Sequence, residues 1–170
     1  MRIVVISDTH GNFRALEKIV SAHINTADIF IHLGDGRREI DRVLMTYPEI
    51  ENRFMIVDGN CDLGFFNGNP YVIAHADGHK IFAVHGHRQG VKYSLDDLKE
   101  CAKANDCDIV LFGHTHQRYN SYEEGMYIMN PGSASCPRDS FSPSYGVIDS
   151  SEKGVVMNIA EVNTLYCSTN

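Results

Sequence analysis

The sequence predicts an α/β fold in which two mixed β-sheets pack into a sandwich. Apolar runs of strand length alternate with amphipathic helical patterns along the first part of the chain, whereas most of the last third carries strand patterns without intervening helices. A length of 170 residues and a hydrophobic content of 43% suit one sizeable core. No repeat, low-complexity tract or charged linker marks a boundary, so we expect residues 1–170 to form a single domain.

Short apolar runs bounded by turn residues are typical of buried strands. Four such runs are residues 3–6, 29–33, 54–57 and 109–112. Helical patterns occupy residues 16–20, 40–44 and 95–104, and Asn12 is placed to cap the first of them. This alternation predicts right-handed crossovers between parallel strands that are covered on both faces.

The second half of the chain adds a hairpin and further strands. Asp77 and Gly78 favour a tight turn between strands at residues 71–76 and 80–85. Other strand patterns are residues 127–130, 145–149 and 155–162. Parallel and antiparallel pairs must therefore coexist, which makes the predicted sheets mixed.

Composition excludes several classes of protein. The formal net charge of −7 disfavours broad binding to nucleic acid or to an anionic membrane surface. The N-terminal apolar run is too short for a signal-peptide core or a membrane span. Five cysteines without a C-x-x-C pair fit reduced thiols better than a disulfide framework, so we expect a cytoplasmic protein.

Side chains that can bind metal ions follow five of the predicted strands. Glycine adjoins or lies within each cluster, which allows sharp turns and a close approach of the backbone to an ion. Because the carboxyl ends of parallel strands form the ligand-binding edge of an open α/β sheet, we expect these loops to converge. The residues are Asp8 and His10, then Asp35, Asn60, His85 with His87, and His114 with His116.

The types and spacing of these residues indicate a metal centre. Residues i and i+2 of an extended segment point to the same side, so Asp8 can act with His10, and His114 with His116. Imidazole, carboxylate and carboxamide ligands without thiolate suit Mn, Fe, Zn or Ni. Two divalent ions would outweigh the charges of Asp8 and Asp35, and the resulting positive site favours an anionic substrate.

In this order, the clusters resemble the metallophosphoesterase signature of calcineurin-like enzymes. The matching motifs are Asp8-x-His10, Gly34-Asp35, Gly59-Asn60, His85 and Gly113-His114-x-His116. The short chain and the variants at residues 59–62 and 130–133 are similar to the small bacterial and archaeal YfcE-type phosphodiesterases. The resemblance covers residues 8–133 and implies a four-layer αββα sandwich of two mixed sheets with helices outside.

The resemblance also implies two ion positions that share Asp35. The first would be completed by Asp8, His10 and His116, and the second by Asn60, His85 and His114. Two divalent ions are thus the expected cofactors. Manganese is the expected metal, with Ni, Fe, Zn and Mg as alternatives.

One departure from the family pattern concerns proton transfer. Many members carry a histidine directly after the metal-binding asparagine, whereas this chain has Cys61 after Asn60. A neutral thiol replaces imidazole poorly in proton transfer near neutral pH. We therefore expect catalysis to depend on the metals and on Asn60, with His87 in a helping role.

The expected reaction is hydrolysis of a small phosphodiester by a metal-bridging hydroxide that attacks phosphorus in line. The expected partner is a small-molecule phosphate ester, with nucleic acid only as substrate ends, and a homo-oligomer is compatible with the sequence. Arg37, Arg38 and Arg138 are candidates for touching substrate phosphate, against an ordinary solvated role. Two alternatives stay open: a protein-binding scaffold on the same fold, and a metallohydrolase for carboxylic esters or amides.

Overall fold

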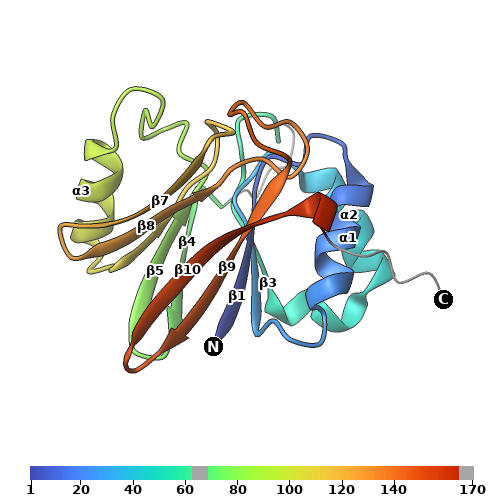
Figure 1. Ribbon diagram of the computed structural model, residues 1–170, viewed down its shortest axis with the longest axis horizontal. Coiled ribbons are helices and arrows are strands. Elements are labelled where there is room, and N and C mark those ends of the chain that lie inside the picture. The colour runs from blue at the N-terminus through green and yellow to red at the C-terminus, as the bar shows by residue number, and fades with distance from the viewer. Residues whose placement is uncertain (63–68, 165–170) are drawn as a thin grey trace.

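The computed structural model describes residues 1–62 and 69–164, in which two five-stranded β-sheets pack against each other (Figure 1). The first sheet has the strand order β10-β9-β1-β2-β3. Its three N-terminal strands run parallel, while β9 and β10 pair antiparallel. The strands are β1 (Arg2–Ile6), β2 (Ile29–His32), β3 (Phe54–Ile56), β9 (Ser144–Ser151) and β10 (Gly154–Glu161).

The second sheet is also mixed and has the order β4-β5-β6-β8-β7. Strands β5, β6 and β8 run parallel, and each edge strand is antiparallel to its neighbour. The strands are β4 (Tyr71–Ala76), β5 (His79–Val84), β6 (Ile109–Leu111), β7 (Arg118–Glu123) and β8 (Met126–Pro131). The hairpin predicted around Asp77 and Gly78 is formed by β4 and β5.

Helices cover the outer face of each sheet and complete four layers. The first sheet is covered by α1 (Phe13–His23) and α2 (Arg37–Thr46), and the second by α3 (Asp96–Ala104) (Figure 1). Short 3₁₀ helices are Pro48–Arg53 and Val162–Thr164. No helix in residues 1–62 and 69–164 combines the length and apolar character needed to cross a membrane. The predicted four-layer fold class is confirmed.

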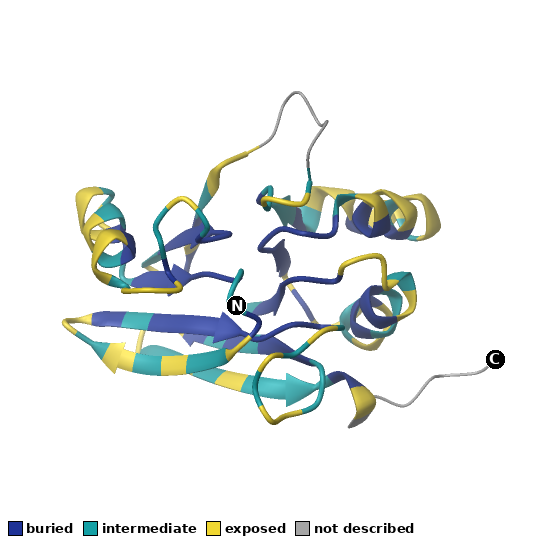
Figure 2. Cartoon of the chain, turned by 90° about the horizontal axis from the view of Figure 1, so that it is seen from above, coloured by how far each residue is buried: buried dark blue, intermediate teal, exposed yellow. Residues whose placement is uncertain are grey.

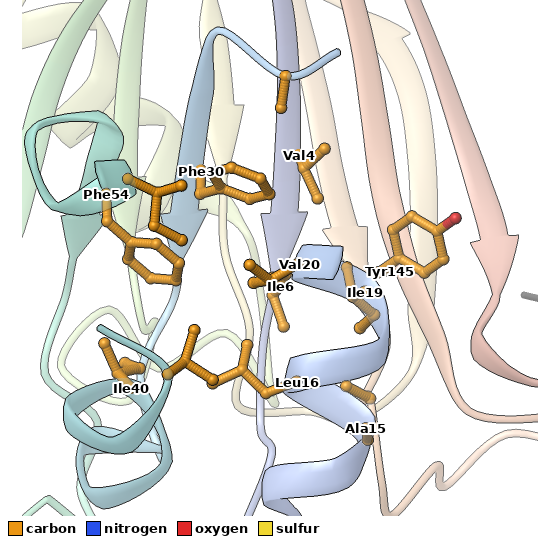
Figure 3. Packing of buried hydrophobic residues seen from close by; sticks show 14 of the residues in the cluster. Val4, Ile6, Ala15, Leu16, Ile19, Val20, Phe30, Ile40, Phe54 and Tyr145 are labelled. Atoms are coloured by element: carbon orange, nitrogen blue, oxygen red, sulfur yellow. The ribbon is translucent and has the colours of Figure 1, made fainter. Parts of the chain in front are cut away.

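Strand β1 contributes to two of the three hydrophobic layers because its side chains alternate between the faces of the sheet. Val4 and Ile6 pack toward α1 and α2, where the rings of Phe30 and Phe54 stack at 5.6 Å (Figure 3). Ile3 and Val5 face the second sheet. Seen from above, several strands are largely buried, while other strands and the outward helix faces carry intermediate and exposed residues (Figure 2). The loops that follow β1 therefore start from a strand held on both sides.

Sequence patterns located the helices and most strands but missed β7. The segment Arg118–Glu123 is largely polar and half-exposed, so no apolar run marks this edge strand. Its usable signal is the turn at Glu124 and Gly125, both of which have positive φ and join β7 to β8. Asn12 caps α1 as predicted, since its Oδ1 accepts a hydrogen bond from the backbone N–H of Ala15 at 3.1 Å.

A buried polar network ties the loop after β1 to β2 and α2. His32 is fully buried, and its Nδ1 accepts a hydrogen bond from the backbone N–H of Gly34 at 3.2 Å. Its Nε2 lies 3.3 Å from the hydroxyl of Thr9, which donates to Glu39 at 2.9 Å. The same Glu39 oxygen accepts the backbone N–H of Gly11 at 2.6 Å. Burial lowers the pKa of His32 to about 4, so this imidazole stays neutral at neutral pH.

Acidification should destabilise the metal-free protein through His32. In the unfolded chain this residue has a pKa of about 6.5, so the unfolded state binds the additional proton between about pH 6.5 and 4. The free energy of unfolding should fall by about 3 kcal/mol over this window. His32→Gln should remove this contribution, and urea unfolding of both chains at stepped pH in chelator would measure it. Parallel curves for the two proteins would contradict the assignment.

Candidate metal centre

The structure gathers the predicted ligand residues at the carboxyl ends of five strands, drawn from both sheets. In a first group, Nε2 of His10 lies 3.1 Å from Nε2 of His116 and 3.7 Å from Oδ1 of Asp8. Oδ1 of Asp8 is also 3.1 Å from Nε2 of His116. Two ligand atoms of one ion, each bonded at about 2.1 Å, are roughly 3 Å apart. These separations fit a shared ion.

Asp35 connects this group with a second one. Its Oδ2 lies 3.7 Å from Nε2 of His10 and 3.6 Å from Nε2 of His85. Nε2 of His85 is in turn 3.1 Å from Oδ1 of Asn60, and the rings of His85 and His114 are 5.0 Å apart. Asp35 therefore lies between the two groups, as the sequence resemblance implies.

The ligand groups form a buried floor with an open rim. Asp8, Asp35, His85 and His116 are buried, with exposed fractions of 0 to 4%. His10 and Asn60 are exposed, and His114 is partly exposed. Ions held on this floor would remain accessible to a substrate from the rim.

The backbone at these residues is left-handed, which corrects the extended geometry predicted for the two i, i+2 pairs. The φ angles are 56° at Asp8, 43° at His10, 58° at Asp35, 67° at His114 and 59° at His116. Positive φ is unfavourable for non-glycine residues and is often concentrated at functional sites. Sharp local turns, rather than straight strand extensions, bring these side chains together.

Glycines allow the ligand loops to touch. A Cβ atom on Gly59 would lie 2.0 Å from Oδ1 of Asp35, and one on Gly34 would lie 2.6 Å from the backbone nitrogen of Gly59. A Cβ on Gly113 would lie 2.0 Å from the hydroxyl of Ser7. A side chain at any of these positions would push two loops apart, so the glycines seen in the motifs have a direct steric role.

Two of the histidines are held by backbone carbonyls. Nδ1 of His85 lies 2.7 Å from the carbonyl oxygen of Leu33, and Nδ1 of His116 lies 2.7 Å from that of Cys136. A carbonyl can only accept, so each Nδ1 carries the proton and the neutral ring keeps its lone pair on Nε2. Both lone pairs point into the cluster.

Asp8 shows that the cluster fits a cation. Its Oδ2 accepts hydrogen bonds from the hydroxyl of Ser7 and, at 3.1 Å, from the backbone N–H of His114. Its Oδ1 is buried and accepts no hydrogen bond within the described residues, although Nε2 of His116 is only 3.1 Å away. The short contact is not a hydrogen bond when that nitrogen presents a lone pair. Acceptors that face one another in a buried place are stabilised by positive charge between them, which a proton or a metal ion can supply.

The titration behaviour of the metal-free cluster agrees with this need. Burial by itself would raise the pKa of Asp8, but the imidazoles of His10 and His116 lower it well below its ordinary value. The neighbouring carboxylate of Asp8 raises the pKa of His10. Burial, with His85 nearby, lowers the pKa of His114 to about 4. The centre thus contains an ionised carboxylate that attracts positive charge.

His87 and Cys61 flank the ligand groups. The ring of His87 lies 5.3 Å from that of His85 and 6.1 Å from that of His114. Its Nδ1 is buried without a hydrogen-bond partner in the described residues, and burial lowers its pKa. Partial desolvation, reinforced by Asp35, raises the pKa of the Cys61 thiol to about 11, although the residue as a whole is exposed. Cys61 is therefore a neutral thiol in the metal-free protein.

A cavity of about 300 Å³ adjoins the first ligand group. Its lining includes His10, Asp35 and Cys61 together with Arg37 and Arg38 at the start of α2. The third predicted arginine, Arg138, is near enough to His10 for its charge to oppose part of the rise in the pKa of that imidazole. All three arginines thus lie near the cluster.

Sequence reasoning missed residues that support the ligands from behind. Ser133, fully buried after β8, donates its hydroxyl to the carbonyl oxygen of Asp8 at 2.7 Å. Asn130 donates its amide to the carbonyl oxygen of Gly113 at 2.9 Å. Asp62 accepts backbone N–H groups from the loop that carries Asp35. The sequence did hold a signal for these residues, because all three are polar and lie inside the motifs at residues 59–62 and 130–133.

Residues 1–153 match the family model of the calcineurin-like phosphoesterase superfamily domain. The probable metallophosphoesterase YsnB of Bacillus subtilis is 32% identical over 149 residues, covering 87% of this chain and 83% of that protein. The phosphodiesterase YfcE of Escherichia coli is 27% identical over 175 residues, covering 92% of this chain and 91% of that protein.

Solved structures have the same fold. A conserved protein from Streptococcus pneumoniae, described as a predicted phosphoesterase, has a TM-score of 0.84 at 22% identity and covers 98% of this chain and 93% of that one. Vacuolar Protein Sorting 29 from Cryptosporidium parvum has a TM-score of 0.70 at 20% identity, with coverages of 94% and 96%. On the matched domain and the homology to YfcE and YsnB, this chain belongs to the calcineurin-like phosphoesterase superfamily.

Proposed function

We propose that the protein is a binuclear metal-dependent phosphodiesterase that hydrolyses small phosphodiesters. The observation that carries the proposal is the cluster of inward-facing acceptor atoms around Oδ2 of Asp35, which lies 3.7 Å from Nε2 of His10 and 3.6 Å from Nε2 of His85. A central carboxylate flanked by two sets of nitrogen and oxygen donors is suited to two divalent ions. Relatives named as phosphodiesterases support the reaction class.

The proposed ligand assignment divides the cluster at Asp35. Manganese is the proposed metal, because neutral imidazole, carboxylate and carboxamide donors suit it and the described ligands contain no thiolate. When bound, two such ions supply Lewis-acid activation of water and stabilise negative charge on the phosphoryl group. The first position is assigned to Asp8, His10, Asp35 and His116, and the second to Asp35, Asn60, His85 and His114.

The protein's own groups orient the substrate around this centre. Asn60 directs its carboxamide oxygen toward Nε2 of His85, at 3.1 Å, and so completes the exposed side of the second position. His87 has an unpartnered buried Nδ1 beside the same position, within the part of the chain that the structure describes. We assign His87 to a hydrogen bond with the leaving-group oxygen, since the neutral Cys61 thiol transfers protons poorly.

The proposed substrate and location follow from access and redox state. The exposed His10 and Asn60 leave the buried ligand residues accessible from solvent. Arg37 and Arg38 line the adjoining cavity, which favours small anionic esters. Among the described cysteines, Cys61, Cys101, Cys107 and Cys136 are free thiols. We therefore place the protein in the cytoplasm, where thiols stay reduced.

A scaffold function is the second candidate. It is favoured by the fold shared with Vacuolar Protein Sorting 29, whose name refers to sorting rather than hydrolysis. Against it, all seven ligand positions carry metal-capable side chains here. Turnover by the purified protein separates the two candidates, because a scaffold needs no metal-dependent catalysis.

Loss of Asn60 should abolish most of the activity. In chelator-treated protein, manganese should restore cleavage of an aryl phosphodiester more strongly than that of the matching phosphomonoester. Asn60→Ala should reduce diester turnover by at least about 100-fold, because the second position loses an oxygen ligand. Asn120→Ala, an exposed change on β7, should retain activity. No turnover by the parent protein with any divalent metal would favour the scaffold.

The role of His87 predicts a dependence on the leaving group. His87→Asn should slow hydrolysis of an alkyl phosphodiester by roughly 100-fold, because the alkoxide needs a hydrogen bond as it departs. Hydrolysis of a p-nitrophenyl diester should change little, since that phenolate leaves without assistance. His75→Asn on β4 provides an exposed control. Equal losses with both substrates would exclude this role for His87.

A further inference from the structure

The carboxylate of Asp62 joins the two loops that carry Asp35 and Asn60. Its Oδ1 accepts the backbone N–H groups of Gly36 at 3.1 Å and Arg37 at 3.0 Å. Its Oδ2 accepts those of Asp35 at 2.7 Å and Gly59 at 2.9 Å. One side chain thus satisfies four backbone donors, three from one loop and one from the other.

Two of these donors, Gly36 and Arg37, need an acceptor because they are the N-cap and the first residue of α2. The first backbone N–H groups of an α-helix have no partner within the helix. The residue before α2 is Gly36, which has no side chain to cap them. Asp62 supplies the cap from a distant part of the chain, and its negative charge also suits a helix N-terminus.

The residues preceding Asp62 orient the proposed ligands further. The backbone N–H of Cys61 donates to Oδ1 of Asp35 at 2.7 Å, which leaves Oδ2 for the centre. The amide nitrogen of Asn60 donates to Sγ of Cys61 at 3.4 Å. Its oxygen consequently faces Nε2 of His85. Residues 60–62 therefore orient Oδ2 of Asp35 and Oδ1 of Asn60 toward the centre.

Asp62 is placed as a support and not as a ligand. Each of its oxygens already accepts two N–H groups, and it joins none of the candidate metal-holding groups found within the described residues. We propose that Asp62 is a positioning residue that holds Asp35 and Asn60 in register, so that the second ion position is formed before metal binds. This inference rests on the proposed binuclear function.

The four contacts require a group that only accepts hydrogen bonds. A carboxylate has acceptor sites on both oxygens, whereas the carboxamide introduced by Asp62→Asn would turn an NH₂ group toward two backbone N–H donors. Asp62→Glu keeps the charge but moves it by one methylene. Both changes should loosen the junction, and they do so in different ways.

Metal binding tests the inference separately from activity. Manganese titration of chelator-treated protein should show two ions for the parent chain. In Asp62→Asn and Asp62→Glu, the affinity for one ion should fall by about 10 to 100-fold, as is typical when a group supporting a metal ligand is removed. Turnover should recover toward the parental value at high manganese. A role in folding alone would lower the yield of folded protein without this rescue.

A matched control lies at the other end of the second sheet. Asp108 precedes β6 and accepts the backbone N–H of Lys80 at 2.8 Å, so it also holds two chain segments together. Asp108→Asn should leave both manganese affinities unchanged. Parental affinities in the Asp62 variants would overturn the inference, while a parent chain that binds fewer than two ions would instead contradict the proposed function.

Amide hydrogen exchange tests the same junction without any substitution. In the metal-free parent protein, the N–H groups of Asp35, Gly36, Arg37 and Gly59 should be protected, because Asp62 accepts all four before an ion is present. Exchange at the rate of an unstructured loop would overturn the inference even if both Asp62 variants failed to fold.

Discussion

The close approach of ligand atoms from Asp8, His10 and His116 is the constraint on which the rest of the site depends. Oδ1 of Asp8 and the Nε2 atoms of His10 and His116 face one another at 3.1 to 3.7 Å, on a floor where Asp8 is fully buried. A proton on His10 can satisfy only part of this group, whereas a metal ion can be bound by all three atoms at once. The metal-free chain can keep them together only if the surrounding loops are held firmly from outside.

The two-sheet sandwich provides this support. β1 is covered by helices on one face and by the second sheet on the other, so the loop carrying Asp8 leaves a rigid strand. The loop is then attached to its neighbours through Glu39 on α2 and Ser133 after β8. Left-handed turns at five ligand residues are costly locally, and the packed layers beneath offset that cost. Five of the eight non-glycine residues with positive φ in the described chain therefore lie in the ligand loops.

Local electrostatics explain how an acidic protein can act on a phosphate ester. The chain has a net charge of −7, and the metal-free cluster holds an ionised Asp8 that raises the pKa of His10. This centre attracts cations first. Under the proposed function, two divalent ions reverse the sign of the site and attract the phosphate at short range. The ligands assigned to these ions offer only nitrogen and oxygen atoms, which suits manganese.

By itself the sequence determined the order of strands and helices, the ligand types, and the glycines that accompany them, because hydrophobic periodicity and short motifs are local properties. It did not reveal β7, a polar edge strand that pairs only with β8 among the described strands. It also did not reveal the left-handed backbone at Asp8 and His10. The roles of Asp62 and Ser133 were also beyond it. Their partners lie about 25 and 125 residues away in the chain, and only the folded sheets bring such groups within hydrogen-bond distance. The tertiary structure alone decided which oxygen of each carboxylate faces the centre.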